Sequence, residues 1–368
     1  MAIDLFEAKY IPTIFLRQSE LQAVSELPEA TKESLCPIFC LKPWATCKFL
    51  SQAVDKIEAV FGANRKYFLD IDPFYEVEEV KREAQEEFLA LVDEENAVQN
   101  WIEFLEGYPN ASPCIQMHNS TLESVGQQIQ AFTEMDRPFL IRLNHGGGNG
   151  RDWSEIVDLV CQTDHSNFGF VIDLEWSKDL LSRIEWADRI VKRVVANRGD
   201  GIPVCVNGSS FPNSFTQFED GGTAPLLERL AFQNLVSNNN QARLIYGDWA
   251  SSRPPGESLP IKAEIPPRID LPYANGWEFF RYRRDDGGYR QAATQALASP
   301  SYPHGVDIWG TYLIASTAQS EAFDPKDASL IGHPKKAAAA RINIHLYRQQ
   351  NFENFNPAPD TDDDFEDI

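Results

Sequence analysis

The sequence lacks the segments that direct a chain into or across a membrane. Its first residues, MAIDLFEAKY, have neither a basic start nor an apolar core. No apolar run reaches the ~18 residues that a membrane-spanning helix requires. We therefore expect a cytoplasmic protein with no membrane partner.

Positive charge is also scarce. The 368 residues include 33 Lys and Arg against 55 Asp and Glu, which gives a formal net charge of −22. Such a surface repels the phosphates of bulk nucleic acid and of anionic lipid. A local basic segment, RYRRDDGGYR at 281–290, is the exception. The charge suits a basic partner, or none. We expect other protein subunits, or copies of the chain itself, as partners.

Cysteines are few, and their spacing matches no metal-binding pattern. Cys36 and Cys40 have no second pair at ligand spacing. Most of the six cysteines lie in or beside apolar runs, where a small thiol packs well. We expect reduced core thiols, as is usual in the cytosol. The six are Cys36, Cys40, Cys47, Cys114, Cys161 and Cys205.

Several motifs of nucleotide and acyl chemistry are missing. No Gly-x-Gly-x-x-Gly opens a helix after the first strand, so a doubly wound nucleotide-binding sheet has no support. The segment HGGGNG (145–150) lacks the Lys-Ser/Thr of a P-loop, and it is interpreted as a flexible loop. Gly208-Ser209-Ser210 does not match Gly-x-Ser-x-Gly, which argues against a nucleophile elbow. Its serines are better interpreted as donors to a following segment or to an anion.

What the sequence does contain is a series of short apolar runs. Most are continuous, as in strands that are buried on both faces, and polar segments of helical period lie between them. Their starts are roughly 25 to 47 residues apart, the spacing of a strand-helix unit. The pattern predicts the α/β class and a (β/α)8 TIM-like barrel. The eight runs start at Tyr10, Leu35, Lys66, Pro113, Pro138, Phe168, Ile202 and Ala242.

The pattern changes after the eighth run. Alternating residues around Asn275-Gly276 predict a β-hairpin between about 257 and 284. Helix-prone segments follow, and from Asn351 onward Asn, Pro and Asp predominate. We predict a barrel over 1–255, a hairpin and helical extension packing on the barrel over 256–350, and an acidic, disordered tail over 351–368.

In a barrel, polar residues at the carboxyl ends of the strands converge on one rim, where barrel enzymes place their sites. The strand ends here provide Lys42, Asp70, Asp72, His118, Arg142, Asn144, Asp173, Glu175, Asn207, Ser209, Ser210 and Asp248.

Two of these strand ends contain carboxylate pairs, Asp70 with Asp72 and Asp173 with Glu175. The i, i+2 spacing puts both members of a pair on one face of a strand. Converging carboxylates can hold a divalent cation or act as an acid-base pair. The same residues can instead cap the next helix or pair with Arg142. Both interpretations remain open on the sequence.

With these residues in view, the chain resembles the phage-type beta protein family of phages, prophages and bacterial mobile elements. The resemblance covers nearly the whole length. It rests on KYIPTIFLRQSELQAVSELP, LCPIFCLKP, YFLDID, FLIRL, FVIDLEW, NGSSFPNSF, IYGDWASSRP, WEFFRYRR, GVDIWG and GHPKKAAAARINIHL. It implies a barrel-like fold and an association with phage exclusion or defence. The matching polar residues include Asp70, Arg142, Asp173, Ser209, Ser210, Asp248, Arg281, Arg341 and His345.

Our first functional hypothesis is a barrel protein of phage-host conflict that acts in a complex and binds a phosphate-bearing or nucleotide-like ligand in a polar rim pocket. The ligand-binding residues would be Arg142, Asn207, Ser209, Ser210, Asp248, Arg281, Arg341 and His345.

Two alternatives come from other classes. In the first, a metal-dependent phosphodiesterase or nuclease, Asp70, Asp72, Asp173 and Glu175 hold Mg²⁺ or Mn²⁺. Asp70, Asp173, Glu175 and His118 would then perform the catalysis, with His118 as acid or base. In the second, the barrel is a non-catalytic scaffold whose acidic tail docks on a partner.

Overall fold

A computed structural model describes residues 5, 7–93, 95–117, 121–146, 150–219, 221–254 and 266–355. Eight parallel strands form one sheet, in the order β4-β3-β2-β1-β9-β7-β6-β5. Their bounds are β1 (Tyr10–Phe15), β2 (Ile38–Leu41), β3 (Tyr67–Ile71), β4 (Ala111–Pro113), β5 (Phe139–Asn144), β6 (Phe168–Trp176), β7 (Pro203–Ser209) and β9 (Arg243–Asp248).

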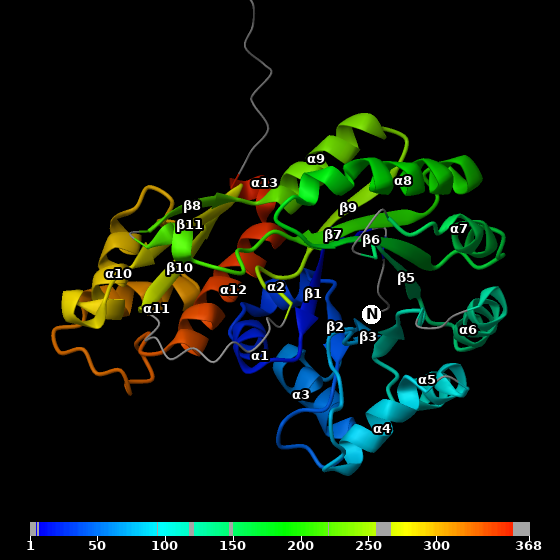
Figure 1. Cartoon of the computed structure of the whole chain (residues 1–368), viewed down its shortest axis with the longest axis horizontal. Helices are drawn as coiled ribbons and strands as arrows, with labels where there is room; N and C mark the ends of the chain where they lie inside the picture. Colours follow the sequence, from blue (N-terminus) through cyan, green and yellow to red (C-terminus); the bar gives the residue numbers. More distant parts are fainter. Residues whose placement is uncertain are drawn as a thin grey trace, which may run out of the picture.

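The two edges of this sheet meet, so the sheet forms a nearly closed barrel (Figure 1). A parallel bridge between Cys114 and Leu140 joins the end of β4 to β5. Seven of the eight apolar runs become barrel strands, whereas the run that starts at Pro113 overlaps β4 only at that residue. The predicted TIM-like fold is confirmed.

Each strand places alternate side chains inside and outside the barrel. Inside, one residue from each strand contributes to a small apolar cluster: Ile11, Ile38, Phe68, Cys114, Leu140, Val171, Cys205 and Ile245. Outside, residues such as Tyr10, Phe39 and Phe170 pack in the main core beneath the helices. Both faces of the strands are buried, which explains why the strand sequences are continuous apolar runs rather than alternating ones.

Helices cover the outside of the barrel. They are α1 (Gln18–Ser25), α2 (Glu29–Ser34), α3 (Ser51–Phe61), α4 (Glu83–Leu91), α5 (Ala97–Glu106), α6 (Leu122–Glu134), α7 (Ser154–Cys161), α8 (Ile184–Arg198) and α9 (Leu227–Asn238). Short 3₁₀ turns add η1 (Leu180–Arg183) and η2 (Thr216–Phe218). The amino end of α6 has a capping box between Thr121 and Ser124. No helix of the described part of the chain is both long enough and apolar enough to span a membrane.

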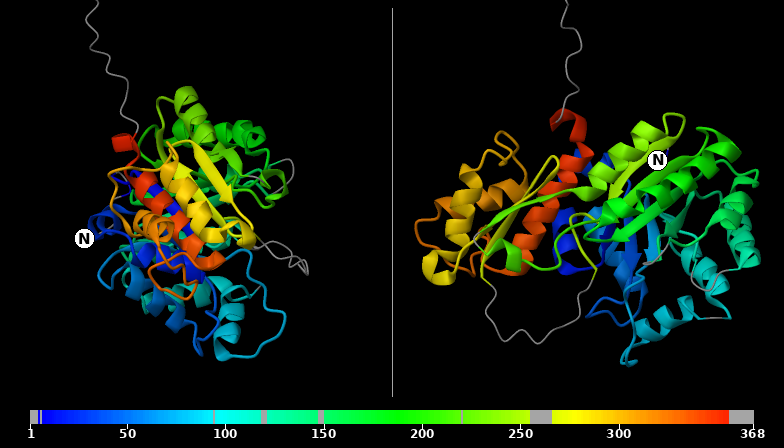
Figure 2. Two further views of the ribbon diagram at one scale, coloured as in Figure 1. Left: turned by 90° about the vertical axis from the view of Figure 1, so that its left-hand side faces the viewer. Right: turned by 45° about the horizontal axis from the view of Figure 1, so that its top comes forward.

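A second sheet follows the barrel. The predicted hairpin is present as β10 (Arg268–Tyr273) and β11 (Gly276–Arg281), which pair antiparallel. β8 (Gly222–Pro225) adds a third strand to it, so the order is β10-β11-β8. The turn η3 (Arg284–Asp286) and helices α10 (Gly288–Ala298) and α11 (Trp309–Gln319) complete the extension, which projects from one side of the barrel (Figure 2).

Helix α12 (Pro334–Gln350) lies between the barrel and the extension (Figure 1). It packs on α1 and β1 of the barrel and also on β10 and α11. Ile342 and Leu346 belong to the main barrel core, whereas Ala340 and Ile344 belong to the core of the extension. α12 therefore serves as an outer helix of the barrel although the extension separates it from β9 in sequence.

The chain from Asn351 onward was predicted to be disordered. Within it, Phe352–Phe355 form a short helix, α13, so the prediction was wrong for these residues. The rest of the predicted tail, 356–368, lies outside the described residues, as do 147–149 of the glycine-rich loop and the 255–265 part of the region around the hairpin.

All six cysteines are buried and free. Burial raises the pKa of the Cys36 thiol to about 12, which keeps it protonated at neutral pH. The prediction of core thiols is confirmed.

Candidate functional site

A charged layer lies above the apolar cluster inside the barrel. Arg142 of β5 reaches three other strands: its Nε is 3.2 Å from Asp70 Oδ2, its Nη1 is 3.6 Å from Asp173 Oδ2, and its Nη2 donates to Thr13 Oγ1 at 2.8 Å. Asn207 Nδ2 donates to the same Thr13 oxygen at 2.9 Å. β6 is the neighbour of β5 in the sheet, but β1 and β3 are not, so the contacts of Arg142 with Thr13 and Asp70 must cross the interior and these side chains face the barrel axis.

Burial determines the electrostatics of this layer. It raises the pKa of Asp70 and of Asp173, against the opposing charge of Arg142. Although burial opposes it, the two carboxylates raise the pKa of Arg142, which stays charged. The guanidinium therefore lies between two carboxyl groups whose pKa values are higher than in water, so that each takes up a proton more readily.

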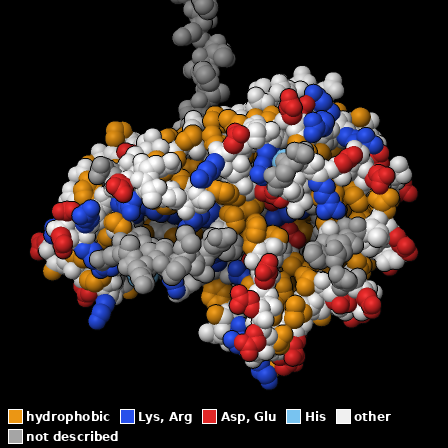
Figure 3. Space-filling model, viewed as in Figure 1, with side chains coloured by type: hydrophobic (Ala, Val, Ile, Leu, Met, Phe, Trp, Pro, Cys, Tyr) orange, Lys and Arg blue, Asp and Glu red, His pale blue; other side chains and the backbone are white. Residues whose placement is uncertain are grey.

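The mouth of the barrel, at the carboxyl ends of the strands, lies one layer further out. Lys42 Nζ is 2.9 Å from Asp72 Oδ2, and Arg183 Nη1 is 3.3 Å from Glu175 Oε2. Trp249 Nε1 donates to Asp173 Oδ1 at 3.2 Å. Figure 3 shows a hollow over the centre of the barrel in which charged side chains of both signs gather.

The four carboxylates proposed to bind a metal do not form a single cluster. Asp70 and Asp173 pair with Arg142, while Asp72 and Glu175 each have a cation of their own. Asp72 Oδ1 and Asp173 Oδ1 also accept backbone N–H groups two residues further on, as in capped turns. Among the described residues, no group of three or more His, Cys, Asp and Glu could hold a metal ion. His118 lies outside the described residues.

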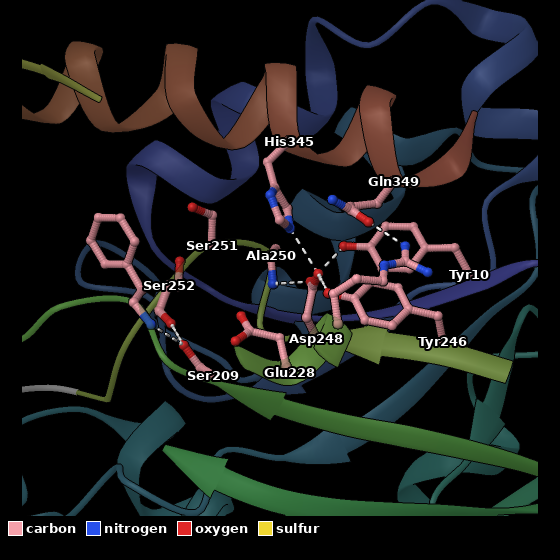
Figure 4. Close-up of polar contacts among 12 residues, drawn as sticks. Tyr10, Ser209, Glu228, Tyr246, Asp248, Ala250, Ser251, Ser252, His345 and Gln349 are labelled. Carbon is pink, nitrogen blue, oxygen red and sulfur yellow. Dashed lines mark hydrogen bonds and ion pairs between the residues drawn. The ribbon is translucent and has the colours of Figure 1, made fainter. Parts of the chain in front are cut away.

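Asp248 lies in a second polar cluster, on the outer face of β9 beneath α12. Its carboxylate accepts from Tyr10 Oη at 2.5 Å, Tyr246 Oη at 2.8 Å and Ala250 N at 2.8 Å. His345 Nε2 is 2.7 Å away, and Figure 4 shows this ring pointing from α12 toward Asp248. Asp248 is 0% and His345 1% exposed, so a ligand in the barrel mouth cannot reach either side chain.

His345 and the tyrosines hold the Asp248 carboxylate in its charged form. Burial alone would raise the pKa of Asp248, but the charge and hydrogen bond of His345 and the two hydroxyl donors outweigh burial and lower it. This cluster joins α12 to strands β1 and β9.

The serines at the end of β7 bond to the protein itself. Ser209 Oγ donates to the Ser252 carbonyl, and Ser210 Oγ accepts from Leu227 N at 3.0 Å at the start of α9. The Ser210 hydroxyl also donates to Glu228 (Figure 4 shows Glu228 near Asp248). The turn thus caps the next helix, one of the two roles expected for it.

The remaining predicted ligand residues lie between the barrel and the extension. Arg341 Nη1 pairs with Asp270 Oδ2 at 2.7 Å, and its guanidinium stacks 4.1 Å from the centre of the Phe211 ring. Arg281 Nη1 donates to the Phe215 carbonyl at 2.8 Å. The structure therefore groups Arg142 with Asn207, but places Asp248 with His345 and Arg341 with Asp270.

Several members of these clusters were not predicted from the sequence. Thr13, Tyr10, Tyr246 and Glu228 were not selected, because each lies inside an apolar or helical run. One signal was available: Tyr246 and Asp248 share a strand face at i, i+2, and Tyr10 is the register partner of Tyr246. A buried acid beside two tyrosines on paired strands indicates a hydrogen-bonded cluster.

The fold and this interior define a (β/α)8-barrel protein with a charged layer at the carboxyl ends of its strands. The model of the Beta protein family matches residues 10–351, and the chain belongs to that family. It is similar to Protein beta of Enterobacteria phage P4, with 27% identity over 349 residues, covering 92% of each chain.

A solved structure, a xylose isomerase-like TIM barrel/4-hydroxyphenylpyruvate dioxygenase fusion protein, gives a TM-score of 0.37 with 12% identity. The match covers 68% of this chain and 40% of that fusion protein.

Proposed function

We propose that the barrel mouth binds a phosphate-bearing, nucleotide-like ligand, and that the protein acts with it in phage-host conflict. The position of Arg142 carries this proposal. Its side chain is 11% exposed, inside the barrel and at the end where barrel proteins bind their ligands. A guanidinium is suited to phosphate because its fork of donors can bind two oxygens at once.

Asp70 and Asp173 compete with the ligand for Arg142, and their environment makes this competition favourable to the ligand. Burial raises the pKa of both carboxyls. When the phosphate of a ligand approaches Arg142, protonation of Asp70 or Asp173 removes the repulsion between that carboxylate and the phosphate. It also frees guanidinium donors for the ligand. Lys42, paired with Asp72 at the mouth, provides a second cation within the same rim.

The mouth also offers a surface for a flat ring. Phe74 is 37% exposed, and its ring lies 5.8 Å from that of Phe15 and 5.5 Å from that of Trp249. An exposed aromatic ring at a mouth that also holds Lys42 can stack a base while its phosphate is bound. This combination favours a nucleotide over inorganic phosphate alone.

The binding test is isothermal titration with nucleoside mono-, di- and triphosphates. We expect Arg142→Gln to weaken binding at least about 10-fold, the equivalent of one charged hydrogen bond. Phe74→Ala should weaken it while leaving the fold intact, because the side chain is exposed. Arg65→Gln, at the opposite end of the barrel beside Glu29, is the control. If the wild type bound no nucleotide of the panel, the proposal of a nucleotide-like ligand would be refuted.

The biological test is the plating efficiency of a panel of phages on bacteria that express the protein. The proposed role rests on membership of the family and on the phage relative. Wild type should change plating efficiency, and Arg142→Gln should abolish the change at equal protein level. An unchanged efficiency for every phage with the wild type would refute the role.

Association with other subunits, or with copies of the chain, is part of the proposal. Leu230 and Val236 of α9 are 40% and 43% exposed, and Tyr312 of α11 is 54% exposed. Such side chains are suited to contacts between proteins. Sedimentation analysis of the purified protein, alone and from its native host, measures the assembly, and a monomer in both would exclude it.

A further inference from the structure

A cavity of about 320 Å³ lies outside the barrel, between the amino ends of α7 and α8. None of its lining residues belongs to the interior layer or to the cluster around Asp248. They are Gly150, Arg151, Asp152, Trp153, Ser154, Val157, Trp186, Arg189, Ile190 and Arg193. We call it the Arg-Trp pocket.

The floor of the pocket is apolar and aromatic. Trp153 and Trp186 are 3% and 4% exposed, and Val157 and Ile190 are buried beside them. Both indole N–H groups bond to the protein: Trp153 Nε1 donates to the Asn144 carbonyl at 2.8 Å and Trp186 Nε1 to the Arg151 carbonyl at 2.9 Å. The indoles therefore offer the cavity carbon surface and π-electrons rather than donors.

The rim of the pocket is cationic. Arg151, Arg189 and Arg193 are exposed side chains around it, whereas the lining contains one acid, Asp152. Arg193 is paired with Asp158, but no carboxylate of the described chain pairs with Arg151 or Arg189. Asp152 interacts with Arg189 only at longer range, so in a chain with a net charge of −22 the rim of this cavity has an excess of positive charge.

The backbone at Gly150 lies close to the Trp186 indole at one side of the cavity. Gly150 has φ +84°, and a Cβ there would lie 2.5 Å from Trp186 Cδ1. Glycine thus lets the chain approach the indole closely. Arg151 then stacks with its guanidinium 4.0 Å from the centre of the Trp153 ring. A second cavity of about 450 Å³ shares Arg151, Asp152 and Trp153 with the first.

From this geometry we propose that the Arg-Trp pocket binds a small aromatic anion: a flat ring held against the indoles, with a phosphate or carboxylate held by Arg151 and Arg189. The volume is at the lower end of small-molecule sites, which favours a mononucleotide-sized compound over a polymer. The site is separate from the barrel mouth and does not depend on the function proposed for it.

The test is fluorine NMR of the full chain labelled with 5-fluorotryptophan, which gives a signal for each of the 8 tryptophans. Trp153→Phe and Trp186→Phe assign the two signals of the pocket. The probes are AMP, indole-3-acetate, and uncharged adenosine. AMP or indole-3-acetate should shift these two signals. A response to AMP alone indicates a site for phosphate, and a response to indole-3-acetate alone indicates a site for carboxylate. Either response supports the proposal.

Arg151→Gln with Arg189→Gln should weaken the binding about 10-fold for each arginine. Arg290→Gln, an exposed arginine of α10, is the matched control and should leave it unchanged. The proposal is overturned if neither anion shifts the two signals at millimolar concentration. It is also overturned if adenosine binds as well as AMP, or if the double variant binds like the wild type. Shifts at Trp249 alone would place the ligand at the barrel mouth and would also overturn it.

Discussion

Glu228 makes the stability of this protein depend on pH in an unusual direction. Its side chain is buried, and its Oε2 accepts from Ser210 N at 3.1 Å and from the Ser210 hydroxyl. Among the described residues, Oε1 has no hydrogen-bond partner. Burial, reinforced by the charge of Asp248, raises the pKa of Glu228 from 4.5 to about 8. The folded protein therefore retains a proton here that the unfolded chain releases.

The sign and size follow from proton linkage. Between pH 4.5 and about pH 8 the folded state binds one more proton at Glu228 than the unfolded state, so raising the pH destabilises the fold. Each pKa unit corresponds to about 1.4 kcal/mol, so the shift reduces the free energy of unfolding by about 5 kcal/mol in total. This contribution is absent below the unfolded pKa and complete above the folded pKa.

Glu228→Gln removes the titration and keeps the shape of the side chain. Urea denaturation of both proteins at pH 5, 7 and 8.5 measures the difference in unfolding free energy. We expect the variant to gain about 3 to 4 kcal/mol relative to wild type between pH 5 and pH 8.5. Glu103→Gln, an exposed glutamate of α5, is the control. A difference that does not change with pH would refute the assignment of the buried proton to Glu228.

Three further predictions concern stability and reactivity. His345→Ala removes the side chain that pairs with the buried Asp248 carboxylate and should lower the unfolding free energy by about 3–5 kcal/mol, whereas the exposed His304→Ala should have little effect. A loss below about 1 kcal/mol would contradict the role of the pair. Gly276→Ala places a Cβ against the Ala224 carbonyl and the Tyr273 ring, and should lower the thermal midpoint, whereas Gly126→Ala in α6, which meets no atom within 4 Å, should not. The six cysteines should resist iodoacetamide at pH 8 in the folded protein and react fully in urea, as measured by mass spectrometry; rapid labelling of Cys36 would show that it is accessible.

The barrel could be predicted from the sequence because its strands are buried on both faces. Continuous runs such as Phe168–Trp176 are unmistakable under this constraint. The hairpin was predictable because Asn275-Gly276 marks its turn. β8 was missed because it has four residues, of which Ala224 alone is buried, and it depends on β11 for its pairing. α11 was missed because its apolar residues do not follow a clear helical stripe.

The candidate site could be predicted in part. The i, i+2 rule predicts one strand face for Asp70 with Asp72 and one for Asp173 with Glu175. Asp72, however, follows the last residue of β3, and Glu175 has φ +56° at a register shift in β6. The rule does not predict contacts across the barrel, where Arg142 pairs with Asp70 and donates to Thr13. Asp248 faces outward with Tyr246 because side chains alternate along β9, but its partner His345 comes from α12, whose position follows from the extension rather than from any local pattern.

The position of α12 also has a consequence for how the chain is made. Asn343 of α12 donates to the Ala23 carbonyl of α1 at 2.9 Å across 320 residues, and its Oδ1 accepts from Gly310 N in the extension. During synthesis, α1 leaves the ribosome about 320 residues before Asn343 of α12, so its outer surface stays uncovered until α12 has been made. Assembly of the barrel is thus completed by late, long-range contacts, which slow folding and expose the early segments to chaperones. A chain that ended within the extension would lack α12 and would leave the outer surface of α1 and β1 exposed. A stable barrel therefore requires translation to the end of α12.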